Sequence, residues 1–175
     1  MAKEDGVLSS RTEATPENMN IKVLKPSRKR LRPGDIFIFQ MKSEPDIFRF
    51  GRVIRTDASV GFFENLILIY VYKATSHCVS EIPPLRPSEL LVPPMTTNRL
   101  GWVRGYFETV ANRPLTPADL LPAHHFRDSR GKYFDDDSNE VSNPIPPVGE
   151  WGLASFGAID IDVSEALGIP VPGQV

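Results

Sequence analysis

The stretch RLRPGDIFIFQ, residues 30–40, contains the change from a charged segment to a strand. Pro33 suits the second position of a turn and Gly34 the third, where a positive φ is needed, which is typical of a type II turn. The four residues from Ile36 to Phe39 are β-branched or aromatic and favour a strand. Because both faces of this strand are apolar, we expect it to be covered on both sides or to lie where a sheet closes on itself.

Two later segments extend this strand into an antiparallel meander. Residues 47–55 alternate between apolar and charged side chains, and Gly51 within them indicates a bulge or a close backbone approach. The turn-like residues 56–61 lead to a third apolar strand at 65–73. Since this much apolar surface must be hidden, the sequence predicts an α+β fold that is mostly β. We expect an antiparallel, strongly curled sheet or a small SH3-like barrel, with one or two short helices.

The rest of the chain is expected to add shorter elements. Prolines within 81–98 leave room for no more than one helical turn, and residues 101–115 return to strand character. Thr116 and Pro117 are typical of the start of a short helix at 115–121. Residues 124–143 are expected to form an irregular polar hairpin. In residues 148–170, the alternation from Ile159 to Val163 fits a strand, whereas the spacing of Phe156, Ile159, Val163 and Leu167 also fits a helix. We expect a strand that leads into a short helix from Ser164, with Gly168 as its stop.

Composition and length indicate one soluble domain. The chain has 175 residues, of which 41% are hydrophobic and 24% charged. Its one cysteine, Cys78, excludes an intramolecular disulfide and fits a reducing compartment. The first ten residues lack the apolar run of a signal peptide, and the run at 66–72 is too short to cross a bilayer. We therefore expect a cytoplasmic protein with a flexible basic arm at 1–28, a binding domain at 29–170 and a tail at 171–175.

The charge is distributed unevenly along the chain. The whole chain has a formal net charge of −2, whereas residues 1–32 hold 8 Lys/Arg and 4 Asp/Glu. The remaining residues are therefore acidic, and an acidic body repels nucleic acid and attracts basic partners. The run KPSRKRLR, residues 25–32, supports an alternative function, a small β-barrel nucleic-acid-binding module with this run as its electrostatic arm.

An acidic run provides the candidate partner-binding residues. Turn residues are rich in Asp and Asn, so this run fits a hairpin tip; it also fits an acidic surface patch that meets a basic partner. Aromatic side chains dominate the anchors of interfaces, although Trp102 at strand spacing also fits a core position. The predicted contact residues are Asp135, Asp136, Asp137, Glu140, Tyr133 and Trp102.

Motifs for chemistry are missing from the sequence. There is no nucleotide-binding glycine loop and no Cys/His zinc spacing. His124 and His125 are adjacent, so in an extended chain their rings point to opposite faces. A metal-assisted hydrolase that uses these histidines and the run Asp135–Asp137 is the enzymatic alternative. Since nothing assembles a nucleophile, a base and oxyanion donors, we expect a binding module, not an enzyme, with no cofactor and no metal.

Five stretches in this order resemble the bacterial immunity protein 26 family. They are RLRPGDIFIFQ, FRFGRVI at 48–54, GYFETVANRPLTPADLL at 105–121, FRDSRGKYFDDDSNEV at 126–141 and WGLASFGAIDIDVSEALGI at 151–169. The resemblance covers roughly residues 29–170, and the chain departs from it in the N-terminal arm and in the Pro-rich segment 81–98. It implies a small cytoplasmic antidote that neutralises a toxin of a contact-dependent or polymorphic toxin system by occlusion. An acidic body would suit a basic nuclease toxin, because complementary charge raises the association rate.

Overall fold

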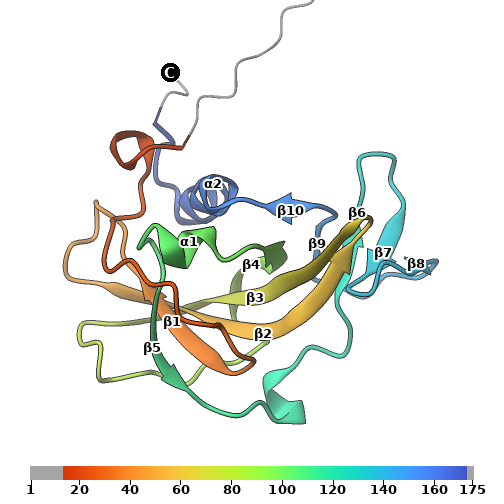
Figure 1. Cartoon of the computed structure of the whole chain (residues 1–175), viewed down its shortest axis with the longest axis horizontal. Coiled ribbons are helices and arrows are strands. Elements are labelled where there is room, and N and C mark those ends of the chain that lie inside the picture. The colour runs from red at the N-terminus through yellow and green to blue at the C-terminus, as the bar shows by residue number, and fades with distance from the viewer. Residues whose placement is uncertain (1–13, 173–175) are drawn as a thin grey trace, which may run out of the picture.

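The computed structural model of the chain describes residues 14–172 (Figure 1). Residues 1–13 of the expected arm and 173–175 of the expected tail lie outside them. Six strands form one sheet in the order β10-β4-β3-β2-β1-β5, and four form a second sheet in the order β8-β7-β6-β9. The elements are η1 (Pro16–Asn18), β1 (Asp35–Phe39), β2 (Phe48–Val60), β3 (Phe63–Ser76), β4 (Leu90–Thr97), α1 (Leu100–Val103), β5 (Glu108–Asn112), η2 (Pro117–Asp119), β6 (His125–Arg127), β7 (Tyr133–Asp135), β8 (Glu140–Val141), β9 (Val148–Glu150), β10 (Leu153–Ala154) and α2 (Phe156–Leu167).

The predicted turn before the first strand is confirmed. Gly34 has a φ of +89°, and its N–H donates to the carbonyl of Val53 at 2.8 Å. Asp35 accepts a hydrogen bond from the N–H of Arg32 at 2.8 Å, so its carboxylate closes the turn. The turn therefore delivers β1 beside β2, and β1, β2 and β3 form the predicted antiparallel meander.

Gly51 in β2 is the site of a close approach, as the sequence indicates. It lies opposite Phe37 of β1, and a Cβ on Gly51 would lie 2.1 Å from Cζ of that ring. The ring of Phe37 in turn contacts Trp102 and Phe107 at centroid distances of 5.0 and 5.1 Å. Only glycine at position 51 leaves room for this aromatic group on the sheet.

Both faces of the six-stranded sheet are covered, and the sheet stays open. Phe37 and Phe39 of β1 belong to one buried cluster, with α1, α2 and residues 19–21, whereas Ile36 and Ile38 belong to a second cluster under the second sheet and connecting loops. The prediction that the all-apolar strand β1 is covered on both sides is thus correct. The expected strongly curled sheet or closed barrel is wrong, because β10 and β5 end the sheet as separate edges. The broader prediction of a mostly β, α+β fold is confirmed.

Two segments between residues 90 and 107 differ from their predicted conformations. Residues 90–97 form strand β4 despite Pro93 and Pro94. Its partner on one side is β3, and on the other side only Thr96–Thr97 pair with β10, so the prolines remove no ladder bond there. Residues 100–103 form the helical turn α1, and β5 begins only at residue 108.

The C-terminal segment is also more helical than predicted. Helix α2 begins at Phe156, where the hydroxyl of Ser155 accepts the N–H of Ala158 at 3.1 Å. The expected strand at 159–163 is therefore wrong; Ile159 and Val163 are buried four residues apart on one helix face. The predicted stop is confirmed, since Gly168 caps the helix with a φ of +68°. No helix within residues 14–172 is long and apolar enough to span a membrane.

The packed part of the chain begins before residue 29, the boundary expected from the sequence. Met19 and Ile21 are 2% and 0% exposed and belong to the core. Ile21 forms a bridge with Met41, and its N–H donates to the carboxylate of Asp160 in α2 at 2.7 Å. Residues of the expected flexible arm are thus fixed to the domain by side-chain burial and by α2.

Candidate partner-binding site

The predicted acidic residues lie together on the acidic hairpin, which we define as residues 133–141. It comprises β7, a tight turn and β8, and Figure 1 shows it beside the distal end of the β2–β3 hairpin. The N–H of Ser59 donates to the carbonyl of Asp136 at 3.0 Å, and Ser59 also forms a parallel bridge with Asp137. Strand β2 thereby fixes the position of the acidic hairpin.

Asp135 uses its carboxylate inside the hairpin. One oxygen accepts the N–H groups of Asp137 and Asn139, both at 2.9 Å, and the other accepts the side-chain amide of Asn139 at 3.2 Å. Ser138, between Asp137 and Asn139, has a φ of +65°, a conformation that tight turns require. Asp135 therefore stabilises the turn with its carboxylate, as expected if the acidic run forms a hairpin tip.

Asp136 faces inward and holds the hairpin to the main sheet. Its carboxylate accepts hydrogen bonds from Arg55 at 2.9 Å and from Nδ1 of His124 at 3.1 Å. Burial alone would raise the pKa of Asp136, but the bonds from His124 and Arg55 outweigh it and lower that pKa to about 2. Asp136 is therefore ionised and is engaged within the protein.

His124, which donates to Asp136, also contacts a buried tyrosine with its other ring nitrogen. The hydroxyl of Tyr70 meets Nε2 of His124 at 2.5 Å and accepts the N–H of Leu121 at 3.0 Å. Burial raises the pKa of Tyr70 to about 12, so the hydroxyl keeps its proton. The line from Tyr70 through His124 and Asp136 to Arg55 joins β3, the segment before β6, the acidic hairpin and β2.

Arg55 connects three carboxylates. It contacts Asp57 at 2.9 Å, Asp136 at 2.9 Å and Asp137 at 2.8 Å. The hydrogen bond to Asp137 is the largest of the effects that raise the pKa of Arg55. The side chains of Asp57 and Asp137 nevertheless stay 73% and 59% exposed, so both present charge to solvent.

The other predicted contact residues are divided between the surface and the core. Glu140 is exposed and lies 3.7 Å from Lys132, while Tyr133 is half-buried in β7. Trp102 lies elsewhere: it is 2% exposed and packs against Phe37 and Phe107. The prediction of Trp102 as a contact residue is corrected, because its segment forms α1 and directs the ring into the core.

Sequence reasoning missed two exposed phenylalanines at the hairpin tip, which we define as residues 60–65. Strand β2 continues to Val60, through most of the turn expected at 56–61, because Ala58 and Val60 are buried. The turn falls at Gly61 and Phe62, and Phe62 and Phe63 are 104% and 58% exposed. The sequence feature that indicates this exposed tip is the pair of phenylalanines directly after a glycine between two strands.

The residues proposed for a metal-assisted hydrolase do not converge. His124 faces Asp136 and Tyr70, whereas the buried His125 accepts the N–H of Ile145 at 2.8 Å. The two rings point to different partners, as expected for adjacent residues. In the described part of the chain, no group of three or more His, Cys, Asp or Glu could hold a metal ion.

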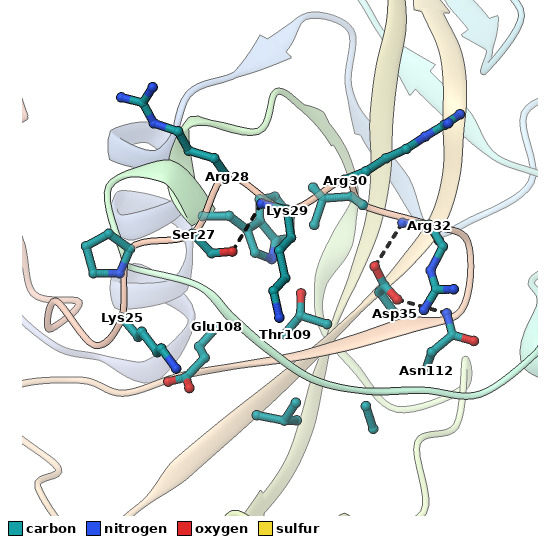
Figure 2. Close-up of a pocket in the computed structure, with 15 residues that line it drawn as sticks. Lys25, Ser27, Arg28, Lys29, Arg30, Arg32, Asp35, Glu108, Thr109 and Asn112 are labelled. Carbon is teal, nitrogen blue, oxygen red and sulfur yellow. Dashed lines mark hydrogen bonds between the residues drawn. The ribbon is translucent and has the colours of Figure 1, made fainter.

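A second charged region is the basic strap, which we define as residues 25–32. It runs beside β5 over a groove with a volume of about 830 Å³. Figure 2 shows Lys25 and Lys29 directed toward Glu108 and Thr109 of β5, and Arg28 and Arg30 directed away. Among the described residues, none of the five cationic side chains of the strap forms an ion pair.

A comparison with known proteins gives one match. A family model described as Immunity protein 26 matches residues 32–136, more than half of the chain. The matched range begins at the end of the strap, contains β1 to β7 and ends inside the acidic hairpin. No curated protein and no solved structure matches the chain.

Proposed function

Because the chain belongs to the Immunity protein 26 family, we propose that it binds a cognate bacterial toxin domain and neutralises it by occlusion. The family membership is the observation that carries this proposal. In this proposal the protein is an inhibitor that acts by binding in the cytoplasm, where the toxin reaches its target. Such a protein needs an exposed surface of fixed shape and no catalytic group of its own.

The acidic hairpin and the exposed carboxylates beside it are the contact surface that we propose. Asp137, Glu140 and Asp57 present charge to solvent from backbone that is hydrogen-bonded in place. Exposed charge of one sign steers a partner of the opposite sign and suppresses wrong partners. The partner that fits is a toxin domain with a basic surface, such as a nuclease.

Co-expression with candidate toxin domains encoded near this gene tests the proposal. We expect cells that produce both proteins to grow and cells that produce the toxin alone to die. The charge-reversed variant Glu140→Lys should protect less well, whereas Glu165→Lys, an exposed position on α2, should protect like the unaltered protein. Cells that die equally fast with and without the protein would overturn the proposed function.

The basic strap supports nucleic-acid binding as a second candidate function. Its unpaired cations could contact phosphates, and a strap of eight residues spans at most about 27 Å of extended chain, enough for a few nucleotides. Deletion of residues 1–32 would also remove Met19 and Ile21 from the core, so substitution is the better test. Salt-sensitive binding of a single-stranded oligonucleotide that is lost in Arg28→Ala/Arg30→Ala would support this function. The absence of binding at low salt would exclude it.

A further inference from the structure

The hairpin tip exposes two large apolar side chains next to each other. Phe62 is 104% exposed and Phe63 is 58% exposed. The other large apolar side chains on the surface of residues 14–172 are separate in sequence: Val23, Leu100, Leu120, Ile145 and Ile161, at 36% to 45% exposure. Single exposed apolar residues are ordinary, whereas adjacent ones mark sites of interaction.

Folding gains nothing from leaving these rings in water. Transfer of a phenylalanine side chain from water to an apolar environment is worth about 1.5–3 kcal/mol, and at the tip this energy stays available for a partner. The strands behind the tip show that the chain can bury such groups, since Val60 and Leu66 on either side are 5% and 6% exposed. The tip thus extends beyond the core that its own strands form.

The backbone of the tip is fixed in place. Val60 pairs with Phe63, and Gly61 between them has a φ of +58°, the conformation that a two-residue hairpin turn needs at its first position. The N–H of Gly61 donates to the hydroxyl of Ser138 at 3.0 Å, and that hydroxyl also meets the one of Ser59 at 3.1 Å. The acidic hairpin therefore supports the tip from the side, and binding loses little conformational entropy of the backbone.

Negative charge surrounds the two rings. Residues 55–65 and 133–141 together contain six carboxylates and one arginine, a formal net charge of −5, whereas the whole chain has −2. Arg55 is bound by three of these carboxylates, so it offers little free positive charge. Glu64 is exposed directly after Phe63. The surface is therefore an apolar anchor inside an acidic border.

We propose that Phe62 and Phe63 are the anchor by which this protein holds its toxin, and that the toxin presents an apolar pocket bordered by Lys and Arg. This inference rests on the proposed function and assigns the occupant of the same surface. Charge complementarity selects the occupant, because a neutral or acidic partner would have to desolvate the surrounding carboxylates without compensation. Anchors of this kind are large side chains near the centre of an interface, and a polar border excludes water from them.

The two parts of this surface should affect binding in different ways. Loss of a buried aromatic anchor mainly raises the dissociation rate, whereas loss of a border charge mainly lowers the association rate and its dependence on salt. Phe62→Ser/Phe63→Ser removes the anchor without removing a contact within the protein at Phe62. Glu64→Gln removes a border charge that has no ion pair among the described residues.

The experiment measures association and dissociation of the purified protein with the purified toxin domain against which it protects cells in the co-expression test. We expect the double phenylalanine variant to lose at least about 30-fold in affinity through faster dissociation, with an unchanged unfolding midpoint. Glu64→Gln should slow association a few-fold at low salt and have no effect at high salt. The matched controls Leu100→Ser and Ile161→Ser replace exposed apolar residues of α1 and α2 and should bind within two-fold of the unaltered protein.

The outcomes separate this inference from the proposed function. If the unaltered protein does not bind the toxin, the proposed function fails. If it binds and the double variant binds equally well, the function stands and the anchor is wrong. A dimer of the unaltered protein that dissociates in the double variant, with toxin binding unchanged, would assign the tip to a second copy of the chain and would also overturn the anchor.

Discussion

The basic strap and the acidic end of the molecule carry formal charges of equal size and opposite sign, and they are fixed by different interactions. The strap carries +5, and the hairpin tip with Arg55, Asp57 and the acidic hairpin carries −5. At the acidic end, Arg55 contacts three carboxylates and His124 contacts one. On the strap the cationic side chains form no ion pairs with residues 14–172, and the backbone is held by bonds such as Ser27 N–H to the carbonyl of Trp102 at 2.9 Å.

This difference separates charges that stabilise the fold, at the acidic end, from charges that are free to contact a partner, on the strap. Gly34, two residues after the strap, bonds to Val53 of β2, and the hairpin tip begins seven residues later at Val60. Seven strand residues span roughly 23 Å, which exceeds the screening length of about 8 Å at physiological salt. The strap and the hairpin tip therefore act on their surroundings independently, and each can be altered without changing the other.

The largest expected effect concerns how the strap is positioned. Ile21→Ala should lower the free energy of unfolding by about 3 kcal/mol, because the side chain is fully buried and its loss leaves a cavity. Val23→Ala, two residues away at an exposed position, is the matched control and should change little. Urea unfolding of both variants measures this. An unchanged stability for Ile21→Ala would show that the N-terminal segment does not belong to the core.

A somewhat smaller effect is expected at the acidic end. Arg55→Met should destabilise the protein by about 2–3 kcal/mol, because Asp136 loses a partner while it remains largely buried. Arg130→Met, whose ion pair with Asp128 is exposed on the arginine side, should leave the unfolding midpoint almost unchanged. Equal effects of the two substitutions would mean that the charges at the acidic end are no more structural than ordinary surface charges.

Local chemistry made part of this arrangement predictable from the sequence. Pro33-Gly34 and the four apolar residues after them specify a turn and a doubly covered strand, and the run at Asp135–Asp137 correctly predicts a hairpin. These features depend on neighbours within a few residues. The pairing of Arg55 with Asp136 crosses 81 positions of the chain, so no short pattern contains it.

The same limit explains the errors on aromatic residues. Trp102 is predicted as a contact residue although its spacing also fits a core position, and it is buried; Phe62 and Phe63, which follow the expected turn, are exposed. Hydrophobicity alone cannot tell these cases apart, because much of a protein's surface is apolar as well. The position of the turn decides whether the two phenylalanines are exposed: β2 ends at Val60 and the turn falls at Gly61 and Phe62, which places both phenylalanines at the tip.

The pH dependence of stability sharpens the contrast further. The pKa of Asp136 is lowered from 3.8 to about 2, so its contribution is present above the unfolded pKa and is lost as pH falls through the folded one. Asp136→Asn should therefore cost about 2 kcal/mol near neutral pH and progressively less from about pH 4 to pH 2. Urea unfolding of both proteins across this range gives the difference. A gap that stays constant down to about pH 2 would contradict the assigned ionisation of Asp136.

The smallest effect is expected on the strap itself. Arg28→Ala/Arg30→Ala removes two side chains that point away from β5 (Figure 2) and form no ion pair with a described residue, so stability should change by less than about 0.5 kcal/mol. The direction should be a slight gain at low salt, because five cations within eight residues repel one another, and high salt should abolish it. Urea unfolding at two salt concentrations measures both effects. A clear loss of stability at low salt would show that the strap cations are held by carboxylates, and the strap would then resemble the acidic end instead of differing from it.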